Sequence, residues 1–317
     1  MKVNLVGFWD YDNYTQLTLP AFRSIIDQHF TFSFFDRHTR YDKASTVFVS
    51  DSYQYNNKNK VVIDELIDAG YLVVFENLQE MQPSMPHSQE NVLQFICAKT
   101  KKPTAGIIEV PMYFWYYEHK LNNYKTISRK LEFKKKFLLM MNLVRPFRDD
   151  ILTVFDDILE DSFYSYVERG IRMPGDSDTV QRWDRYINPA WYNQTQLSVA
   201  VESQMFTTPG TIFVTEKTMK PLALQHPFLM LGCRGTLSLL KDAGFTTYDN
   251  LFDESYDTAS DRIKLVYKQV KNYNGTGYDA TTWSKLQHNH NWFYNEQEVN
   301  RRFTNDIVNP ILEFVNG

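Results

Sequence analysis

A short polar motif, Thr215-Glu216-Lys217, lies at the predicted start of a helix over residues 216–225. Thr215 is a favourable N-cap, and the first turn of a helix presents unpaired N–H groups and a partial positive charge. Such a helix end can bind a diphosphate, to which Lys217 adds a mobile cation, while Glu216 can accept hydrogen bonds from ribose hydroxyls. The motif therefore indicates a nucleotide site. The alternative is a capped helix with a solvated lysine, which is the commoner role of an isolated motif of this kind.

Acidic side chains follow three predicted strands in the first half of the chain, namely Asp10, Asp51 and Glu76. In open α/β sheets, ligands bind beyond the carboxyl ends of the strands, so all three side chains could face a substrate cleft. A carboxylate in that position could act as general base on an acceptor hydroxyl. The alternative for Glu76 is a turn residue that ends its strand.

Three pairs of potential metal ligands occur, and we expect none of them to hold a metal. The pairs are Asp10 with Asp12, Asp176 with Asp178, and His288 with His290. The first pair mimics a D-x-D motif that holds a divalent cation against a donor diphosphate, but it lies at the first strand, away from the donor motif. The two histidines have bulky aromatic neighbours and no acidic partner at a suitable spacing, which indicates helix packing.

The elements that must position these residues alternate between strand and helix in both halves of the chain. In the first half, strands are predicted near residues 3–9, 31–35, 46–50, 71–75 and 107–110, with helices at 19–29 and 61–69. In the second half, strands are predicted at residues 137–141, 197–201 and 227–231, with helices at 148–159, 216–225 and 236–243 and a helical tail. This alternation predicts an α/β fold with parallel sheets. We expect a Rossmann-like domain at residues 1–130 and a second Rossmann-like domain, with the tail, at residues 131–317.

Length and composition narrow the class of protein. A chain of 317 residues is long enough for two α/β domains, and its net charge of −4 argues against a surface that follows nucleic acid throughout. Cys97 and Cys233 are the cysteines, and their spacing fits neither a disulfide framework nor a structural zinc site. The apolar run before Asp10 is too short for a signal peptide or a membrane span, so we expect a cytoplasmic protein.

Four motifs resemble, in the same order, those of the α-1,3-fucosyltransferase family. The most specific is Val214-Thr215-Glu216-Lys217, which follows Val201-Glu202-Ser203 and matches the V-T-E-K hallmark of the family. Asn142-Leu-Val-Arg-Pro-Phe-Arg148 is similar to the family's N-x-x-x-P-x-R loop. Val74-Phe75-Glu76-Asn77 is similar to its G-E-N motif, and Val110-Pro-Met-Tyr-Phe-Trp-Tyr-Tyr117 to its M-P-Y-Y-like segment.

The resemblance implies an inverting, metal-independent glycosyltransferase, a hexosyl- or pentosyltransferase, with a GT-B-like α/β fold. Two Rossmann-like domains, an acceptor domain at residues 1–130 and a donor domain at residues 131–317, would face a cleft, with helices at the end of the chain. The donor would be a GDP-sugar, fucose-like, the acceptor a glycan or other hydroxyl, and no cofactor would be needed. Glu76 would be the catalytic base. The donor-binding residues implied are Arg148, Glu202, Phe213, Thr215, Glu216 and Lys217, with Arg145, Asp10 and Asp51 as secondary candidates.

The sequence also departs from the family pattern. Phe75 replaces the glycine of G-E-N, Ser203 replaces an asparagine, and Lys220-Pro221 lies within the helix after the T-E-K motif. These differences indicate a distant branch in which the donor sugar and the acceptor can both differ. The T-E-K-T-x-K-P-L and D-E-S-Y-D stretches are similar to phage-encoded glycosyltransferase-like proteins.

A basic run between residues 125 and 136 keeps a different acceptor open. If the acceptor were a hydroxymethylated base of DNA, these lysines would contact its phosphates and nearby aromatic residues would stack on the extruded base. A solvated linker is the alternative for the run. A third hypothesis is a protein of the same fold that binds a nucleotide or glycan without turnover, although a pure binder has no need of a base such as Glu76.

Overall fold

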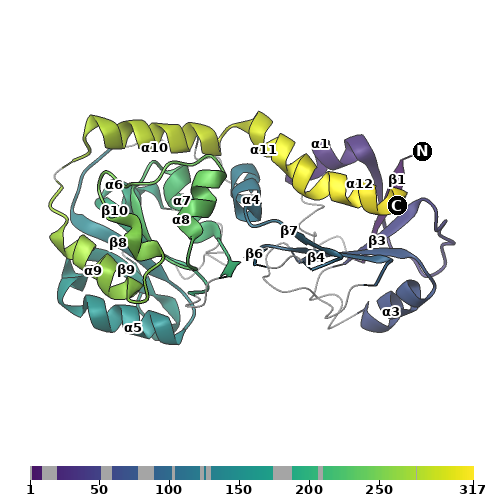
Figure 1. Cartoon of the computed structure of the whole chain (residues 1–317), viewed down its shortest axis with the longest axis horizontal. Coiled ribbons are helices and arrows are strands. Elements are labelled where there is room, and N and C mark those ends of the chain that lie inside the picture. The colour runs from purple at the N-terminus through teal and green to yellow at the C-terminus, as the bar shows by residue number, and fades with distance from the viewer. Residues whose placement is uncertain are drawn as a thin grey trace. The chain divides into compact units, whose positions relative to one another are not determined.

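The computed structural model describes residues 2–8, 20–50, 59–77, 89–101, 104–121, 125, 130–173, 188–205, 210–275 and 277–317. The chain divides into two compact units, of which the first is Met1–Tyr116 together with Glu296–Gly317 and the second is Tyr117–Asn295. Both are α/β units with parallel sheets, as the alternating pattern predicted (Figure 1). No helix within the described ranges is both long and apolar enough to cross a membrane.

The first unit is built on a six-stranded sheet with the order β2-β1-β3-β4-β5-β7. Its strands are β1 (Val3–Gly7), β2 (Phe30–Phe34), β3 (Thr46–Ser50), β4 (Leu72–Asn77), β5 (Val92–Ile96) and β7 (Ile107–Glu109), with β6 (Lys99–Thr100) beside them in sequence. All five pairings are parallel. Continuous apolar runs such as β3, which is buried along its whole length, are typical of parallel strands covered on both faces.

Helices α1 (Pro20–His29) and α3 (Lys60–Asp68) connect these strands, and α4 (Tyr113–Leu121) follows β7. Ile63 and Ile67 lie one turn apart on α3 and pack in a core cluster with Phe48 and Phe75 of the sheet. Side chains alternate between the two faces of a strand, so this cluster fixes the face to which each residue of β4 points.

The end of the chain belongs to the first unit. Its elements are α11 (Glu296–Phe303), a π-helical turn (Thr304–Val308) and α12 (Asn309–Asn316). Tyr116 Oη donates a hydrogen bond of 2.5 Å to Asp306 Oδ2, and the guanidinium of Arg302 lies 5.5 Å from the centre of the Trp115 ring. The expected domain limits differ from this division, because residues 117–130 belong to the second unit and residues 296–317 to the first.

The second unit has a four-stranded parallel sheet with the order β12-β10-β8-β9. Its strands are β8 (Lys135–Met141), β9 (Ser162–Tyr166), β10 (Thr195–Val201) and β12 (Phe228–Leu231), with a short β11 (Thr211–Ile212) after β10 in sequence. The α-helices are α5 (Pro146–Phe155), α6 (Pro189–Asn193), α7 (Glu216–Ala223), α8 (Thr236–Asp242), α9 (Arg262–Asn272) and α10 (Ala280–Phe293). Among the described residues of this unit, 3-10 turns occur at Asp156–Asp161, Val167–Arg169 and Glu254–Asp257.

The winding of this second sheet reverses at β8. The chain passes from β8 to β9 on one side and then crosses back to β10 on the other side. Loops at such a reversal leave the carboxyl edge in opposite directions and open a crevice in which α/β proteins commonly bind ligands. Helices α5 and α9 pack side by side, as do α7 and α10 (Figure 1).

Candidate functional site

The loops that follow β8 and β10 meet at the point where the winding reverses. The first loop carries Arg145 and leads into α5, while the second begins with Glu202 and Ser203. Helix α7 starts beside them, capped by Thr215, whose side chain accepts a hydrogen bond from the N–H of Lys217. The motifs singled out in the second half of the sequence therefore come together at one edge of one sheet.

The Glu202 carboxylate joins the end of β10 to the start of α7. It is fully buried, and it accepts hydrogen bonds from Thr215 N (3.1 and 3.2 Å), Thr215 Oγ1 (2.5 Å) and Thr218 Oγ1 (2.5 Å). Gly232, at the end of β12, lies against this side chain, since a Cβ there would come within 3.0 Å of Glu202 Cγ. The position of the α7 N-terminus is thus set by a buried carboxylate.

Arg148 links the loop that follows β8 to the loop that follows β10. Only 2% of its surface is exposed, and its two terminal nitrogens donate to Leu143 O (2.9 Å) and Glu202 O (3.0 Å). Burial lowers the pKa of this guanidinium. Arg145, three residues earlier, is the exposed cation of the same loop. The main contacts of Arg148 are therefore with the backbone of both loops, a role that the sequence did not indicate.

Glu216 and Lys217 form an ion pair at the first turn of α7. Lys217 Nζ lies 2.5 Å from Glu216 Oε1, and it also donates to Ser203 Oγ at 3.2 Å. Burial opposes ionisation of Glu216, but the nearby charges of Lys217 and Lys220 outweigh it and hold the pKa below its usual value. The Lys217 side chain keeps 12% of its surface exposed. An anion at this helix end would find the Lys217 ammonium group beside the first turn of α7.

The remaining predicted site residues are placed differently. Phe213 is buried in the segment that leads to Thr215. Glu76 is fully buried and lies within β4, opposite Phe95 in the register, on the sheet face away from α3. Five of the aspartates considered above lie outside the described residues, namely Asp10, Asp12, Asp51, Asp176 and Asp178.

The two histidines considered as metal ligands, His288 and His290, instead contact backbone carbonyls of neighbouring segments. A ring nitrogen of His288 lies 2.9 Å from Gly244 O, and one of His290 lies 2.8 Å from Ala223 O, so both tie α10 to backbone carbonyls. Across the described ranges, no three His, Cys, Asp or Glu residues gather as metal ligands would.

Three lysines of the basic run contact other groups of the protein. Lys130 pairs with Glu132 at 2.9 Å, Lys135 Nζ donates to Glu160 O at 2.5 Å, and Lys136 Nζ donates to Lys271 O at 3.1 Å. These contacts favour a structural role for the three lysines over a phosphate-binding surface.

A buried acid, Asp257, that the sequence patterns did not indicate lies where α8 begins. Asp257 accepts a hydrogen bond of 3.3 Å from the N–H of Leu237, and Arg262 is nearby. Burial raises the pKa of Asp257 to about 6, against the opposing effects of the Leu237 N–H and Arg262. Asp257 thus serves the first turn of α8 as Glu202 serves that of α7, and only tertiary contacts reveal either role.

The two parallel α/β units define a GT-B-like fold. The chain is similar to the crystal structure of an alpha1,3-fucosyltransferase, with a TM-score of 0.51 over 94% of this chain and 92% of that chain. Sequence identity is 11%, so the likeness concerns the fold. No protein-family model matches the chain, and no curated protein sequence matches it either.

Proposed function

We propose that the chain is a glycosyltransferase that moves a sugar from a nucleotide sugar to a hydroxyl acceptor. The observation that carries this proposal is the Glu216 and Lys217 pair at the start of α7, at the reversal point of a parallel sheet. A helix N-terminus at such a point suits a diphosphate. The likeness of the fold to that of a fucosyltransferase supports the same reading.

The donor we propose is a GDP-sugar, fucose-like, as the resemblance of the sequence motifs implies. Lys217 would exchange its contact with Ser203 for a phosphate oxygen, since 12% of its side-chain surface is exposed. Glu216 would accept hydrogen bonds from the ribose hydroxyls. Glu202 and Arg148 would support the donor site indirectly, because their hydrogen bonds hold the start of α7 and the two loops in place. Arg145 is the exposed arginine of this edge that could approach the diphosphate.

The reaction we propose is an inverting displacement without a metal. Glu76 takes the proton of the acceptor hydroxyl, the oxygen forms a bond to the anomeric carbon, and the bond from that carbon to the diphosphate breaks. The nucleoside diphosphate leaves with the bonding electrons, and Lys217 together with the α7 N–H groups offsets its added charge. Glu76 is buried in β4, so its variants report on chemistry only if they remain folded.

The acceptor we propose is a glycan hydroxyl. Transfer to a hydroxymethylated DNA base and binding without turnover remain the alternatives, and no feature of the described residues favours either of them. Duplex DNA binding with a steep dependence on salt would indicate the first alternative. Donor binding without consumption by any acceptor would indicate the second.

Calorimetry and thermal shift with GDP-, UDP-, ADP-, CMP- and dTDP-sugars test the donor site directly. A bound donor stabilises the folded state by mass action, so one nucleotide should raise the melting temperature more than the others. Lys217→Ala should weaken that nucleotide, whereas Lys268→Ala, which removes an exposed lysine of α9, should not. Equal behaviour of the two variants would contradict the proposed donor site.

A further inference from the structure

The loop that joins β2 to β3 in the first unit begins with a tight turn at Asp36. Asp36 O accepts a hydrogen bond from Thr39 N (3.1 Å), and the Asp36 carboxylate accepts from His38 N (3.0 Å) and Thr39 Oγ1 (2.9 Å). Aspartate is favoured at the first position of such turns because of these bonds. Tyr41 then anchors the loop, since its Oη accepts from Asp36 N (2.7 Å) and its ring packs against the core of the sheet.

The second acid of the β2–β3 loop is used in the same way. The Asp42 carboxylate accepts hydrogen bonds from Ser45 Oγ (2.7 Å) and Ala44 N (3.2 Å). In both Asp36 and Asp42, hydrogen bonds of this kind hold the carboxyl pKa below its usual value. Each carboxylate is therefore ionised and bound to groups of its own loop, where it fixes the shape of the backbone.

Two arginines of this loop are left without an acidic partner. Arg37 occupies the second position of the turn at Asp36, and Arg40 follows the turn directly. Both side chains are exposed, and within the described ranges neither guanidinium has a hydrogen bond or an ion pair to another group. Lys43, in contrast, donates to Ala69 O. The loop thus presents two available guanidinium groups on a backbone that its own hydrogen bonds hold in place.

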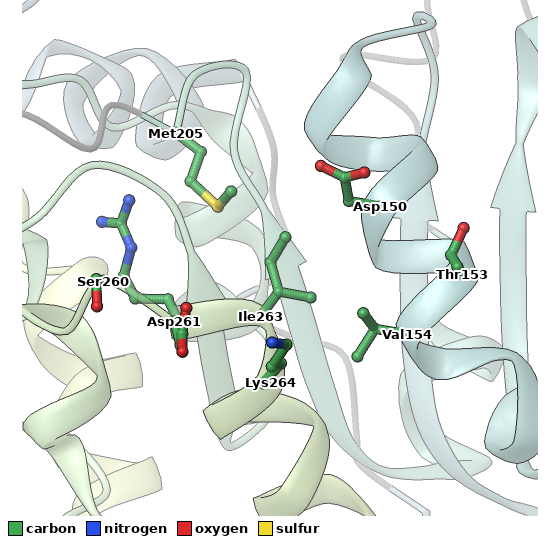
Figure 2. Close-up of a pocket in the computed structure, with 9 residues that line it drawn as sticks. Asp150, Thr153, Val154, Met205, Ser260, Asp261, Ile263 and Lys264 are labelled. Atoms are coloured by element: carbon green, nitrogen blue, oxygen red, sulfur yellow. The ribbon is translucent and has the colours of Figure 1, made fainter.

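A cavity of about 280 Å³ between α5 and α9 of the second unit has a different balance of charge (Figure 2). Asp150 and Asp261 line it together with Arg262 and Lys264, so acids and cations are present in equal number. Nothing in that lining favours an anion over a cation. In the β2–β3 loop, the acids are occupied by hydrogen bonds of the loop itself, and the arginines remain to bind an anion.

The β2–β3 loop leaves the same edge of the sheet toward which Glu76 lies. Phe34 ends β2, and the parallel registers place it in one row with a residue of each of the next three strands, namely Gly7, Val49 and Val74. Strands lie about 4.8 Å apart and rise about 3.3 Å per residue, so Phe34 is about 14 Å from Val74 and about 16 Å from Glu76. The first arginine follows three residues later, a stretch that spans at most about 11 Å. An oligosaccharide of several sugar units can reach from the proposed base to the loop.

We propose that the acceptor is an anionic glycan, and that Arg37 and Arg40 bind an acidic group on it several sugar units away from the hydroxyl that reacts at Glu76. This inference rests on the proposed function. Guanidinium groups bind oxyanions such as carboxylate and phosphate through paired N–H donors. The chain has a net charge of −4, so the attraction depends on this local pair of cations. Two arginines suit a single oxyanion, whereas a DNA duplex needs a basic surface along its length.

Calorimetry on the full chain with three hexasaccharides tests this inference. The probes are hexagalacturonate, which carries carboxylates, a heparin hexasaccharide, which carries sulfates, and cellohexaose, which is neutral. The wild type should bind one of the anionic probes about tenfold or more tightly than cellohexaose, and added salt should weaken that binding. Arg37→Gln and Arg40→Gln should each weaken it, and the double variant should lose the preference. Lys264→Gln, which removes an exposed cation of the second unit, is the matched control and should keep it.

The variants separate the acceptor from the donor. Both arginines are exposed, so the double variant should remain folded, as circular dichroism can check, and should bind the nucleotide sugar as the wild type does. Equal binding of charged and neutral probes by the wild type, or an unchanged preference in the double variant, would overturn the anionic acceptor and leave the donor site intact. Duplex DNA bound more tightly than both anionic probes would overturn it in favour of a nucleic-acid acceptor. If the wild type binds no nucleotide sugar, the proposed function fails and this inference fails with it.

Discussion

Replacing Glu202 by glutamine tests whether a buried carboxylate fixes the start of α7. The change preserves the shape of the side chain but turns one acceptor oxygen into an NH2 group. In the wild type the two oxygens accept from one backbone N–H and two hydroxyls. In either orientation of the amide, its NH2 group faces a hydroxyl and also competes with the Thr215 N–H.

The expected cost follows from these contacts. A hydrogen bond to a charged group contributes about 1.5–3 kcal/mol and a neutral one about 0.5–1.5 kcal/mol. The hydroxyls can rotate and accept from the amide, so the main loss is charge assistance at two contacts. We expect the free energy of unfolding to fall by about 2 kcal/mol at this fully buried site.

Urea unfolding followed by circular dichroism measures the change, with Glu160→Gln as the control because Glu160 is exposed. The control should differ from the wild type by less than about 0.5 kcal/mol. Donor affinity should also fall in Glu202→Gln, since the N–H groups of α7 lose their anchor. Stability and donor affinity that both match the control would refute the reasoning.

The remaining predictions concern the donor, the base, metal and pH. Lys217→Ala should reduce nucleotide affinity by about 1.5–3 kcal/mol in calorimetry, the contribution of a charge-assisted hydrogen bond, while the circular dichroism spectrum is retained. Glu76→Gln should leave nucleotide affinity near wild type, because Glu76 and Lys217 belong to different units, and should lower turnover by about 10²–10⁴-fold; wild-type turnover would remove Glu76 as the base. Sugar transfer should survive treatment with EDTA. Activity that EDTA abolishes and Mg²⁺ or Mn²⁺ restores would instead indicate a metal site at Asp10 and Asp12. The Asp257 pKa of about 6 lies above the ordinary value of 3.8 for an aspartate, so the folded state binds this proton more tightly. Its stabilising contribution should therefore be complete below pH 4 and lost as the pH rises through 6. Urea unfolding from pH 4 to 7 measures this loss, and the Asp257→Asn variant should lack it.

Local sequence patterns were sufficient for the elements around the donor motif. The apolar runs predicted β8, β10 and β12 to within two residues, and the capping threonine correctly marked the first residue of α7. Strand β5 was missed because Gln94 interrupts its short apolar run, which follows a stretch of sequence that contains prolines. Tertiary pairing with β4 and β7 overrides that weak local signal.

Roles set by distant contacts could not be predicted. The sequence pattern of Arg148 indicates a helix start, but its burial depends on carbonyls that lie 5 and 54 residues away from it in the sequence. Similarly, Glu76 was expected at the end of its strand, and it lies within β4 because the pairing with β5 extends through Asn77. The return of the chain to the first unit depends on contacts such as that of Tyr116 with Asp306, which are 190 residues apart.

That return has a consequence for the order in which the protein can fold during synthesis. The strands of the first unit are translated before the second unit, but Phe303, Ile307 and Ile311, whose side chains are fully buried, emerge after it. The second unit is continuous in sequence and complete at residue 295, so it can fold while the first unit still lacks its closing helices. Domains usually fold in the order of translation. Here the first unit translated is the last that can be completed.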